Sequence, residues 1–420
     1  PIRQGIKLEY FKLRGSYGQL GNQNTTSFYP YYQQMSTLMG TVILGGAQAG
    51  VLPVFDPYST SLTWETIENA GVGVDLGMFS NRFNASFDWY QRTTKDMIGP
   101  ALALSAVYGG DAPRTNNAEL RTRGWEVEFS WRDRIGADWS YGISASLSDY
   151  KSIVTKYDSP TGRLRGDAGA EAYYEGKEIG EIWGYRVEGI AKSDKEMQAH
   201  LAKANQSSIG SMWGAGDVMY KDINGDGVVD NGAGTITDHG DWEKIGNSTP
   251  RFAYSFTLEG SWKWIDVRAY FQGVGKRDVF FENSATFFGF GDGKYQRSLY
   301  VDHLDYFRLA GSALGANYED PYYGRLRGDM NNKQVCDRYL QDASYLRLKN
   351  LQIGFTLPKT AKLSKYVEHA RLYVSAENLL TFTNLMIYDP EAIGSATGEY
   401  GAGKTYPQYR TWSVGLELTF

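Results

Sequence analysis

Apolar and polar residues alternate along many segments of the chain, the pattern of a β-strand whose two sides meet different surroundings. In residues 251–262 one side is made by Phe252, Tyr254, Phe256 and Leu258, and the other by Ala253, Ser255, Thr257 and Glu259. Residues 264–272 and 123–132 repeat the pattern. Such segments predict antiparallel strands with one apolar face and one water-facing side.

Ten such segments divide the chain, and the connections between them alternate in length. The predicted strands are Leu8–Tyr17, Thr66–Met78, Arg82–Gln91, Arg123–Arg132, Trp139–Ser148, Arg251–Trp262, Trp264–Gln272, Tyr345–Leu357, Arg371–Asn378 and Tyr409–Phe420. Short or moderate links lie at 79–81, 133–138, 263 and 358–370, whereas long ones fill 18–65, 92–122, 149–250, 273–344 and 379–408. This alternation favours a transmembrane antiparallel β-barrel over a β-sandwich. We therefore predict an all-β fold with short periplasmic turns and long extracellular loops, the largest at 149–250.

The final strand sets the predicted orientation. Residues 409–420 alternate up to a terminal Phe420, and a last strand ending in an aromatic residue resembles the signal recognised by the outer-membrane assembly machinery. We therefore expect a multi-pass protein of the cell outer membrane with a periplasmic C-terminus. The first strand arrives without an upstream partner, so further strands are expected before Pro1, because a closed barrel pairs both edges.

One segment, 36–55, is uncharged over about the length of a membrane helix. It contains four Gly and one Pro and lacks flanking basic residues, so we expect a packed loop instead.

Composition narrows the classes of partner. Aromatic residues make up 15% of the chain, with 31 Tyr and 11 Trp, side chains that suit membrane interfaces and sugar-binding surfaces. A formal net charge of −5 argues against a nucleic-acid partner, which requires a basic surface. The single Cys336 excludes a disulfide within the chain. Residues expected in the aromatic girdles of the barrel are Trp125, Trp131, Trp139, Trp262, Trp264 and Trp412.

Several sequence motifs, in their order along the chain, resemble the C-terminal half of SusC-like (RagA-like) TonB-dependent transporters. They are GKEIGEIWGYRVEGI, the capped helix SDKEMQAH, GDVMYKDINGDGVVD, KIGNSTPRFAYSFTLEGSWKWIDVRAYFQG, SYLRLKNLQIGFTLP, LYVSAENLLTFTN with YDPE, and YPQYRTWSVGLELTF. The resemblance covers most of the chain, from about Leu13 to Phe420. If it holds, residues 1–420 would be the C-terminal part of a transporter barrel.

The resemblance implies a larger assembly. The full protein would be a plugged barrel of about 22 strands, with a plug domain and a TonB box upstream of this chain. It would import an oligomeric nutrient, a glycan or a peptide, with energy from TonB. A SusD-like surface lipoprotein would cover the extracellular mouth of the barrel. Two of these barrel–lipoprotein pairs often form a dimer.

Residues 222–230, DINGDGVVD, predict a calcium loop, because alternating oxygen ligands around the turn at Gly227 can converge on one ion. The candidate ligands are Asp222, Asn224, Asp226, Val228, Asp230, Asp238 and Asp241. The twelfth position is Ala233, where an EF-hand has Glu, so Asp238 or Asp241 is expected to complete the shell. No helix pattern in the sequence brackets the loop, as an EF-hand would require, so we expect a structural ion rather than a sensor. The alternative is an Asx-rich turn held by its own hydrogen bonds.

Tyrosine pairs in the long loops are candidate cargo contacts, because an aromatic face can stack on a sugar ring. They are Tyr31 and Tyr32, Tyr173 and Tyr174, and Tyr322 and Tyr323. The alternative is packing of the loops against one another or against the lipoprotein. Charged residues on the wet strand faces are expected to form a solvated wall with mutual pairs, such as Arg268 with Asp266; the others are Arg14, Asp88, Glu126, Glu128 and Glu377.

We do not expect an enzyme. The four His show no HExxH or HxH spacing, and GSALG at 311–315 has its Ser in the wrong position for a nucleophile elbow. The predicted function is TonB-dependent import of an oligomeric nutrient, with the aromatic loops favouring a glycan over a peptide. The alternatives are a non-transporting outer-membrane adhesin or scaffold barrel, and a soluble β-rich glycan-binding protein or hydrolase, which the apolar strand faces argue against.

Overall fold

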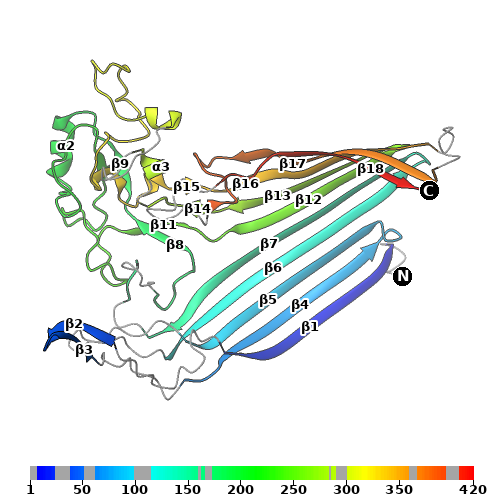
Figure 1. The fold of residues 1–420 in the computed structure, drawn as a ribbon, viewed down its shortest axis with the longest axis horizontal. Helices are drawn as coiled ribbons and strands as arrows, with labels where there is room; N and C mark the ends of the chain where they lie inside the picture. Colours follow the sequence, from blue (N-terminus) through cyan, green and yellow to red (C-terminus); the bar gives the residue numbers. More distant parts are fainter. Residues whose placement is uncertain are drawn as a thin grey trace.

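The computed structural model describes residues 7–23, 38–51, 62–98, 115–158, 162–165, 173–282, 285–289, 300–358, 367–393 and 406–420. Ten strands form one antiparallel sheet in the order β1-β4-β5-β6-β7-β12-β13-β16-β17-β18. They are β1 Leu8–Asn22, β4 Glu65–Met78, β5 Phe83–Ile98, β6 Asn116–Ile135, β7 Trp139–Tyr157, β12 Arg251–Trp262, β13 Ile265–Lys276, β16 Tyr345–Thr356, β17 His369–Thr383 and β18 Thr411–Thr419. The long strands lie side by side, with both termini near one end of the sheet (Figure 1).

All ten predicted strands are confirmed, but several run farther than predicted. β6 and β7 stay paired as far as Ala118↔Tyr157, so the predicted connection 149–250 begins only after Tyr157. The sequence places these ends too early because strict alternation stops there: on β7 the apolar Ile153 and Val154 are adjacent and are flanked by polar residues. Backbone pairing between neighbouring strands does not require an apolar face, and it continues where the alternation fades.

The predicted difference between the two ends of the sheet is also confirmed. Short turns join the strands near the termini, where Phe79, Ser80 and Asn81 take φ of 57°, 59° and 60° and Lys263 takes 53°. The long connections lie at the opposite end (Figure 1). Among the described residues, no helix combines the length and the apolar character needed to cross a membrane.

The prediction of a packed loop at 36–55 is wrong for the part that the structure describes. β2, Leu38–Leu44, and β3, Ala47–Val51, form a separate antiparallel hairpin. Gly45 and Gly46 between them take φ of 61° and 85°. Two successive glycines with positive φ suit the two-residue turn that matches strand twist, so these glycines make a hairpin rather than break up a strand.

Two long connections fold into a lobe at the end of the sheet away from the termini (Figure 1). The lobe comprises the described residues of 162–250 and 277–344. Its elements are β8 Glu181–Gly184, β9 Val187–Ile190, α2 Asp194–Leu201, β10 Val218–Tyr220, β11 Glu243–Asn247, β14 Asp278–Val279, α3 Ala285–Phe288, β15 Gln341–Asp342 and three 3-10 turns, Val301–Leu304, Asn331–Lys333 and Asp337–Tyr339. The predicted cap of α2 is confirmed: Ser193 accepts a hydrogen bond from the Glu196 amide.

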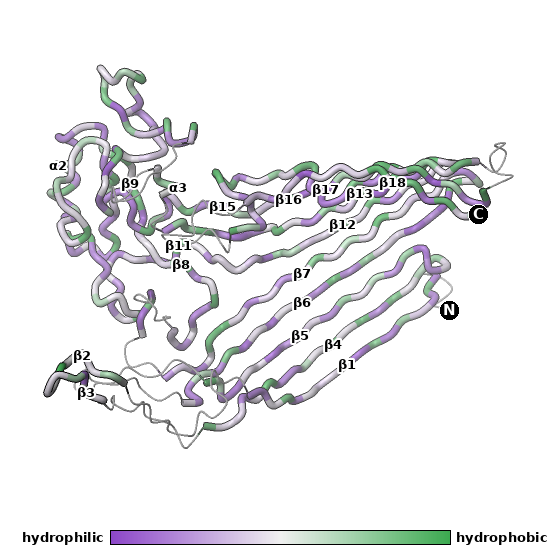
Figure 2. Tube along the Cα trace, viewed as in Figure 1, coloured by the Kyte–Doolittle hydropathy of each residue, from purple (hydrophilic) through white to green (hydrophobic). Residues whose placement is uncertain are grey.

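Buried apolar side chains are concentrated in the lobe rather than on the sheet. The lobe core joins both connections through Tyr185, Tyr220, Phe281, Phe287 and Tyr339, each no more than 2% exposed. Leu385 and Ile393, from the connection after β17, are buried in the same core. Along the sheet, by contrast, apolar residues of one face stay open, with Leu13 67% and Val414 74% exposed. Hydrophobic and hydrophilic residues alternate along these strands (Figure 2). A sheet with one open apolar face and one polar face is suited to lipid on one side and water on the other.

Candidate functional site

The polar face of the sheet carries two continuous rows of side chains near its short-turn end. The strand register aligns one row as Arg132, Gly142, Glu259, Arg268 and Gln352. The second row is Arg134, Ser140, Ser261, Asp266 and Gly354. Because paired residues on neighbouring strands point to the same side, five strands contribute to one surface.

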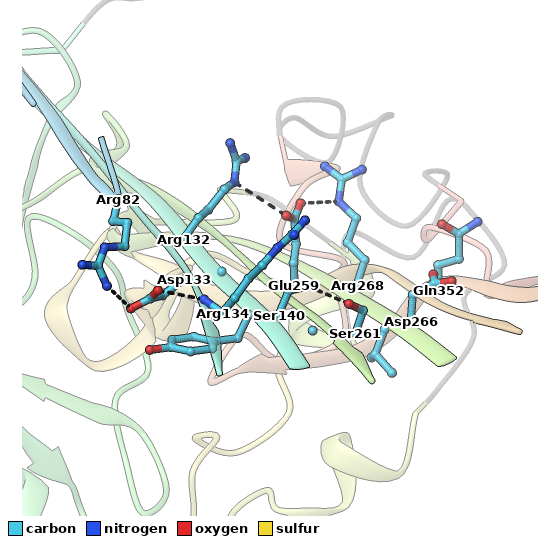
Figure 3. A pocket seen from close by; sticks show the side chains of 14 residues that line it. Arg82, Arg132, Asp133, Arg134, Ser140, Glu259, Ser261, Asp266, Arg268 and Gln352 are labelled. Atoms are coloured by element: carbon cyan, nitrogen blue, oxygen red, sulfur yellow. Dashed lines mark hydrogen bonds and ion pairs between the residues drawn. The ribbon is translucent and has the colours of Figure 1, made fainter. Parts of the chain in front are cut away.

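This surface is hollowed, and arginine side chains gather around it (Figure 3). The hollow measures about 690 Å³ and is lined mainly by the two rows. We call Arg132, Arg134, Arg268 and Glu259 the arginine patch. Glu259 lies between two of its arginines, 4.0 Å from Arg132 Nε and 3.4 Å from Arg268 Nε.

The predicted pair between Arg268 and Asp266 is wrong. Arg268 lies opposite Glu259 in the register and contacts that residue instead. Asp266 accepts hydrogen bonds from Arg371 Nε and Nη2 at 3.1 and 2.6 Å. Arg371 reaches Asp266 from β17 across β16, which passes between them at Gly354, where even a Cβ would lie 2.7 Å from Arg371 Nε. A glycine on the middle strand therefore decides which charges meet.

The other predicted wall charges are placed on the same kind of surface. Arg14 donates to both Asp75 and Asp88, with Nη2–O distances of 2.8 Å to each. Here too a glycine, Gly73, occupies the strand between the partners. Glu126 and Glu128 follow on β6, opposite Asp88 and Ser86. Glu377 lies on β17, paired with Asn350.

The 222–241 loop of the lobe is held by hydrogen bonds from its own backbone. Asp222 accepts from the amides of Gly225 and Gly227 at 2.7 and 2.8 Å. Asn224 and Asp226 each accept from the amide two residues on, at 2.9 and 2.8 Å. Gly225 and Gly227 have φ of 79° and 87°, which is the left-handed region that glycine enters without strain.

Asp241 is the residue that closes this loop. Its side chain is fully buried and accepts from the amides of Ile223, Asn224 and Asp230 at 2.6, 3.2 and 2.9 Å. Burial raises its pKa, against the lowering effect of these hydrogen bonds. Of the two residues predicted to complete the loop, Asp241 therefore reaches inside, whereas Asp238 stays exposed beside Thr235.

The chemistry of the loop suits a hard cation, because every candidate ligand offers oxygen. As the side chains lie, however, most of these oxygens face backbone amides. In the described ranges there is no group of three His, Cys, Asp or Glu placed to hold a metal ion. Calcium at Asp222, Asn224, Asp226, Val228, Asp230, Asp238 and Asp241 therefore stays a prediction.

The predicted tyrosines take up packing positions where the structure describes them. Tyr323 is 3% exposed and donates to the Phe287 carbonyl at 2.8 Å. Tyr174 is 7% exposed and donates to Glu181. Tyr322 accepts from Gln341 at 2.7 Å, and burial raises its pKa to about 12. Tyr173, half-buried, lies edge-on to Tyr157. Tyr31 and Tyr32 lie outside the described residues.

The sequence did not predict two buried networks of paired charged side chains. Asp217, fully buried, is bound by Arg325 and Arg327 from the other lobe connection. Arg347 on β16, 2% exposed, donates from Nη2 to both carboxylate oxygens of Asp389 at 2.8 Å. For Asp389, the sequence offered one local signal, the motif YDPE, because a carboxylate beside Pro in a long loop suggests a fixed turn. Asp217 and its partners carry no such local pattern.

Comparison with known proteins adds the following. Residues 7–379 match the family model described as "TonB dependent receptor-like, beta-barrel". The chain is 27% identical to TonB-dependent receptor P3 of Formosa agariphila over its whole length, which is 40% of that protein. It is 21% identical to TonB-dependent receptor SusC of Bacteroides thetaiotaomicron, with 86% of this chain and 33% of SusC covered. The chain thus spans about two fifths of the length of the curated relatives it matches.

Solved structures show the same fold. A structure of the RagAB peptide transporter superposes with a TM-score of 0.69 at 22% identity, covering 98% of this chain and 41% of the matched one. A structure of the RagAB peptide importer in the "closed-closed" state matches equally well. At this identity the likeness establishes architecture rather than cargo.

Proposed function

Because this chain belongs to the TonB-dependent receptor-like β-barrel family, we propose that it is the C-terminal barrel part of an outer-membrane importer of the SusC/RagA type. The observation that carries the proposal is the ten-strand sheet with an open apolar face, a polar face and a folded lobe at one end. The apolar face supports contact with outer-membrane lipid, and the polar face supports a water-filled interior. No enzymatic step is part of this proposal.

The orientation follows from the same two ends. We place the lobe and the long connections outside the cell, and the short turns, with the C-terminus, in the periplasm. Long extracellular loops and short periplasmic turns are the rule for bacterial outer-membrane barrels. An accessibility test on intact cells checks this: a tag inserted at exposed Gly315 in the lobe should be labelled from outside, and a tag in the turn at Gly136 should not. The reverse labelling pattern would overturn the orientation.

The proposed activity is TonB-dependent import of an oligomeric nutrient, with a SusD-like lipoprotein as partner on the outer face. In support, SusC is among the relatives, and the lobe presents exposed apolar side chains, such as Met212 at 79% and Val301 at 82%, to a protein partner. A plug and a TonB box outside this chain would supply the coupling to TonB. A dimer of transporter–lipoprotein pairs is part of the same proposal.

For the cargo we retain a glycan over a peptide. The support is the aromatic content of the long loops, although Tyr174 and Tyr323 are buried packing residues in the lobe. Other aromatic side chains in those loops would have to make the contact. The 222–241 loop would add structural calcium as a support for the lobe, with Asp241 closing it.

The decisive experiment combines purification with uptake. The full-length protein is extracted from its own outer membrane in mild detergent, and copurifying chains and small molecules are identified by mass spectrometry. In parallel, a deletion strain is fed labelled oligosaccharides or labelled oligopeptides. A stoichiometric lipoprotein and loss of oligosaccharide uptake are expected. Loss of peptide uptake alone would correct the cargo, and unchanged uptake of both would favour a non-transporting adhesin or scaffold barrel.

A further inference from the structure

The arginine patch has more guanidinium groups than carboxylates to pair with them. Arg132 and Arg268 share the single carboxylate of Glu259. In the part of the chain that the structure describes, the Arg134 side chain has no ion-pair partner. Three guanidinium groups around one carboxylate leave two positive charges in excess on this surface.

Neighbouring arginines on the same sheet are already neutralised. Arg82 donates to Asp133 with an Nη1–O distance of 2.8 Å, and Arg371 holds Asp266 with two hydrogen bonds. The contacts of Glu259, at 4.0 and 3.4 Å, are longer than a hydrogen bond. Arg82 and Arg371 therefore lack the excess charge of the patch, where three guanidinium groups surround one carboxylate.

The free ends of the two arginines are oriented for a further ligand. Both contacts with Glu259 use Nε, so the Nη groups of Arg132 and Arg268 are left without a protein acceptor among the described residues. Their side chains are 68% and 59% exposed, and the guanidinium groups project away from the sheet (Figure 3). Two parallel N–H groups of a guanidinium match the two oxygens of a carboxylate.

The floor of the hollow is small and polar. Gly142 lies between Arg132 and Glu259 in the row, and the Ser140 and Ser261 hydroxyls hydrogen-bond to each other at 2.6 Å. These short side chains leave room above the sheet for a ligand to reach both guanidinium groups. A volume of about 690 Å³ is in the range of small-ligand sites.

We propose that the arginine patch is a carboxylate-binding site. The Nη groups of Arg132 and Arg268 hold the carboxylate above Glu259, and Arg134 adds charge beside it. The carboxylate belongs either to an acidic side chain of the protein's own polypeptide or to a free solute, and the contacts at the guanidinium groups are the same in both cases. This inference goes beyond the proposed transport function and does not depend on it.

The test is labelling of the full-length protein with phenylglyoxal, which modifies accessible guanidinium groups, followed by peptide mapping. Arg92 is the fast reference, because it is exposed and its partner is the neutral side chain of Asn69. Arg14, held by two carboxylates, is the slow reference. We expect Arg132 and Arg268 to label about fivefold or more slowly than Arg92, the change that one hydrogen bond produces.

Two arms identify the source of the carboxylate. Slow labelling of the protein alone assigns it to the polypeptide, and slow labelling only after addition of citrate assigns it to a solute. Glu259→Gln is the second variant: protection must persist in it, since the proposed ligand, not Glu259, covers the Nη groups. The proposal is overturned if both arginines label as fast as Arg92 with and without citrate, or if Glu259→Gln removes the protection.

Discussion

The buried carboxylate of Asp217 receives two hydrogen bonds from Arg325, from Nε at 2.6 Å and from Nη2 at 2.5 Å, although 108 residues separate the two. Arg327 adds a contact at 3.0 Å and Asn332 one at 3.1 Å. Asp217 belongs to the first long connection of the lobe, and its partners belong to the second. One carboxylate thus ties the two connections together.

Replacing this carboxylate should loosen the lobe. Asp217→Ala removes the buried carboxylate that Arg325 and Arg327 share. Because Arg327 keeps its ion pair with Asp329, we expect a loss of about 1–3 kcal/mol rather than the full cost of an unpaired buried charge. We expect limited proteolysis of the full-length protein in detergent to cut the lobe much faster. The control is Glu319→Ala, which removes only the exposed ion pair with Lys192. The protease should cut this variant at the same rate as the native protein. Equal rates for both variants would contradict the role of Asp217.

A single added methyl group should distinguish two glycines of the lobe. A Cβ on Gly184 would meet the backbone carbonyl of Val335, with the carbonyl carbon at 2.8 Å, and backbone cannot easily move aside. On Gly189 in the next strand, the first atom met is Met219 Cε at 3.7 Å. Gly184→Ala should therefore destabilise the lobe by about 1–3 kcal/mol, and Gly189→Ala far less, as measured by thermal unfolding of the full-length protein. The same Tm for both variants would rule out this contact.

The buried Asp241 should make lobe stability depend on pH. Burial raises its pKa above the ordinary value of 3.8, so the folded lobe holds this proton more tightly than the unfolded chain does. Its stabilising contribution is therefore complete below that ordinary pKa and is lost as the pH rises through the raised one. Asn does not titrate. As the pH falls from about 7 to about 4, the Tm of the native protein should therefore rise relative to the Tm of Asp241→Asn. A constant difference, or a change of opposite sign, would count against the buried carboxyl.

Calcium should stabilise the same loop if the oxygen ligands turn toward an ion. Adding calcium to the chelator-treated full-length protein should raise the Tm of the lobe, by an amount equivalent to about 2.7 kcal/mol at a hundredfold excess over Kd. Asp226→Asn should reduce this gain, and Asp320→Asn, an exposed lobe residue outside the loop, should leave it unchanged. No gain at millimolar calcium would mean that the hydrogen bonds to Asp222 and Asp241 hold the loop alone.

Much of the sheet could be predicted from the sequence because its signal is local. Alternation along each strand reports the two environments of its faces, and residues such as Phe256 and Glu259 show it within a few positions of each other. The short turns and the capped helix at Ser193 are likewise encoded by neighbouring residues. The ends of the strands were harder to predict, because backbone hydrogen bonding that continues as far as Tyr157 does not require alternating apolar and polar residues.

By itself, then, the sequence determined the all-β class, the ten strands and the alternating lengths of their connections. Its motifs also determined the resemblance to the family. Only the tertiary structure decided which charges meet: Arg371 rather than Arg268 reaches Asp266, and Asp217 reaches Arg325. Likewise, it decided that Tyr323 is buried and that Asp241 closes its loop. The physical reason is that an ion pair or a buried ring depends on distances across strands and between loops. Those distances are set by register, by glycines such as Gly354 and by packing, none of which a local pattern records.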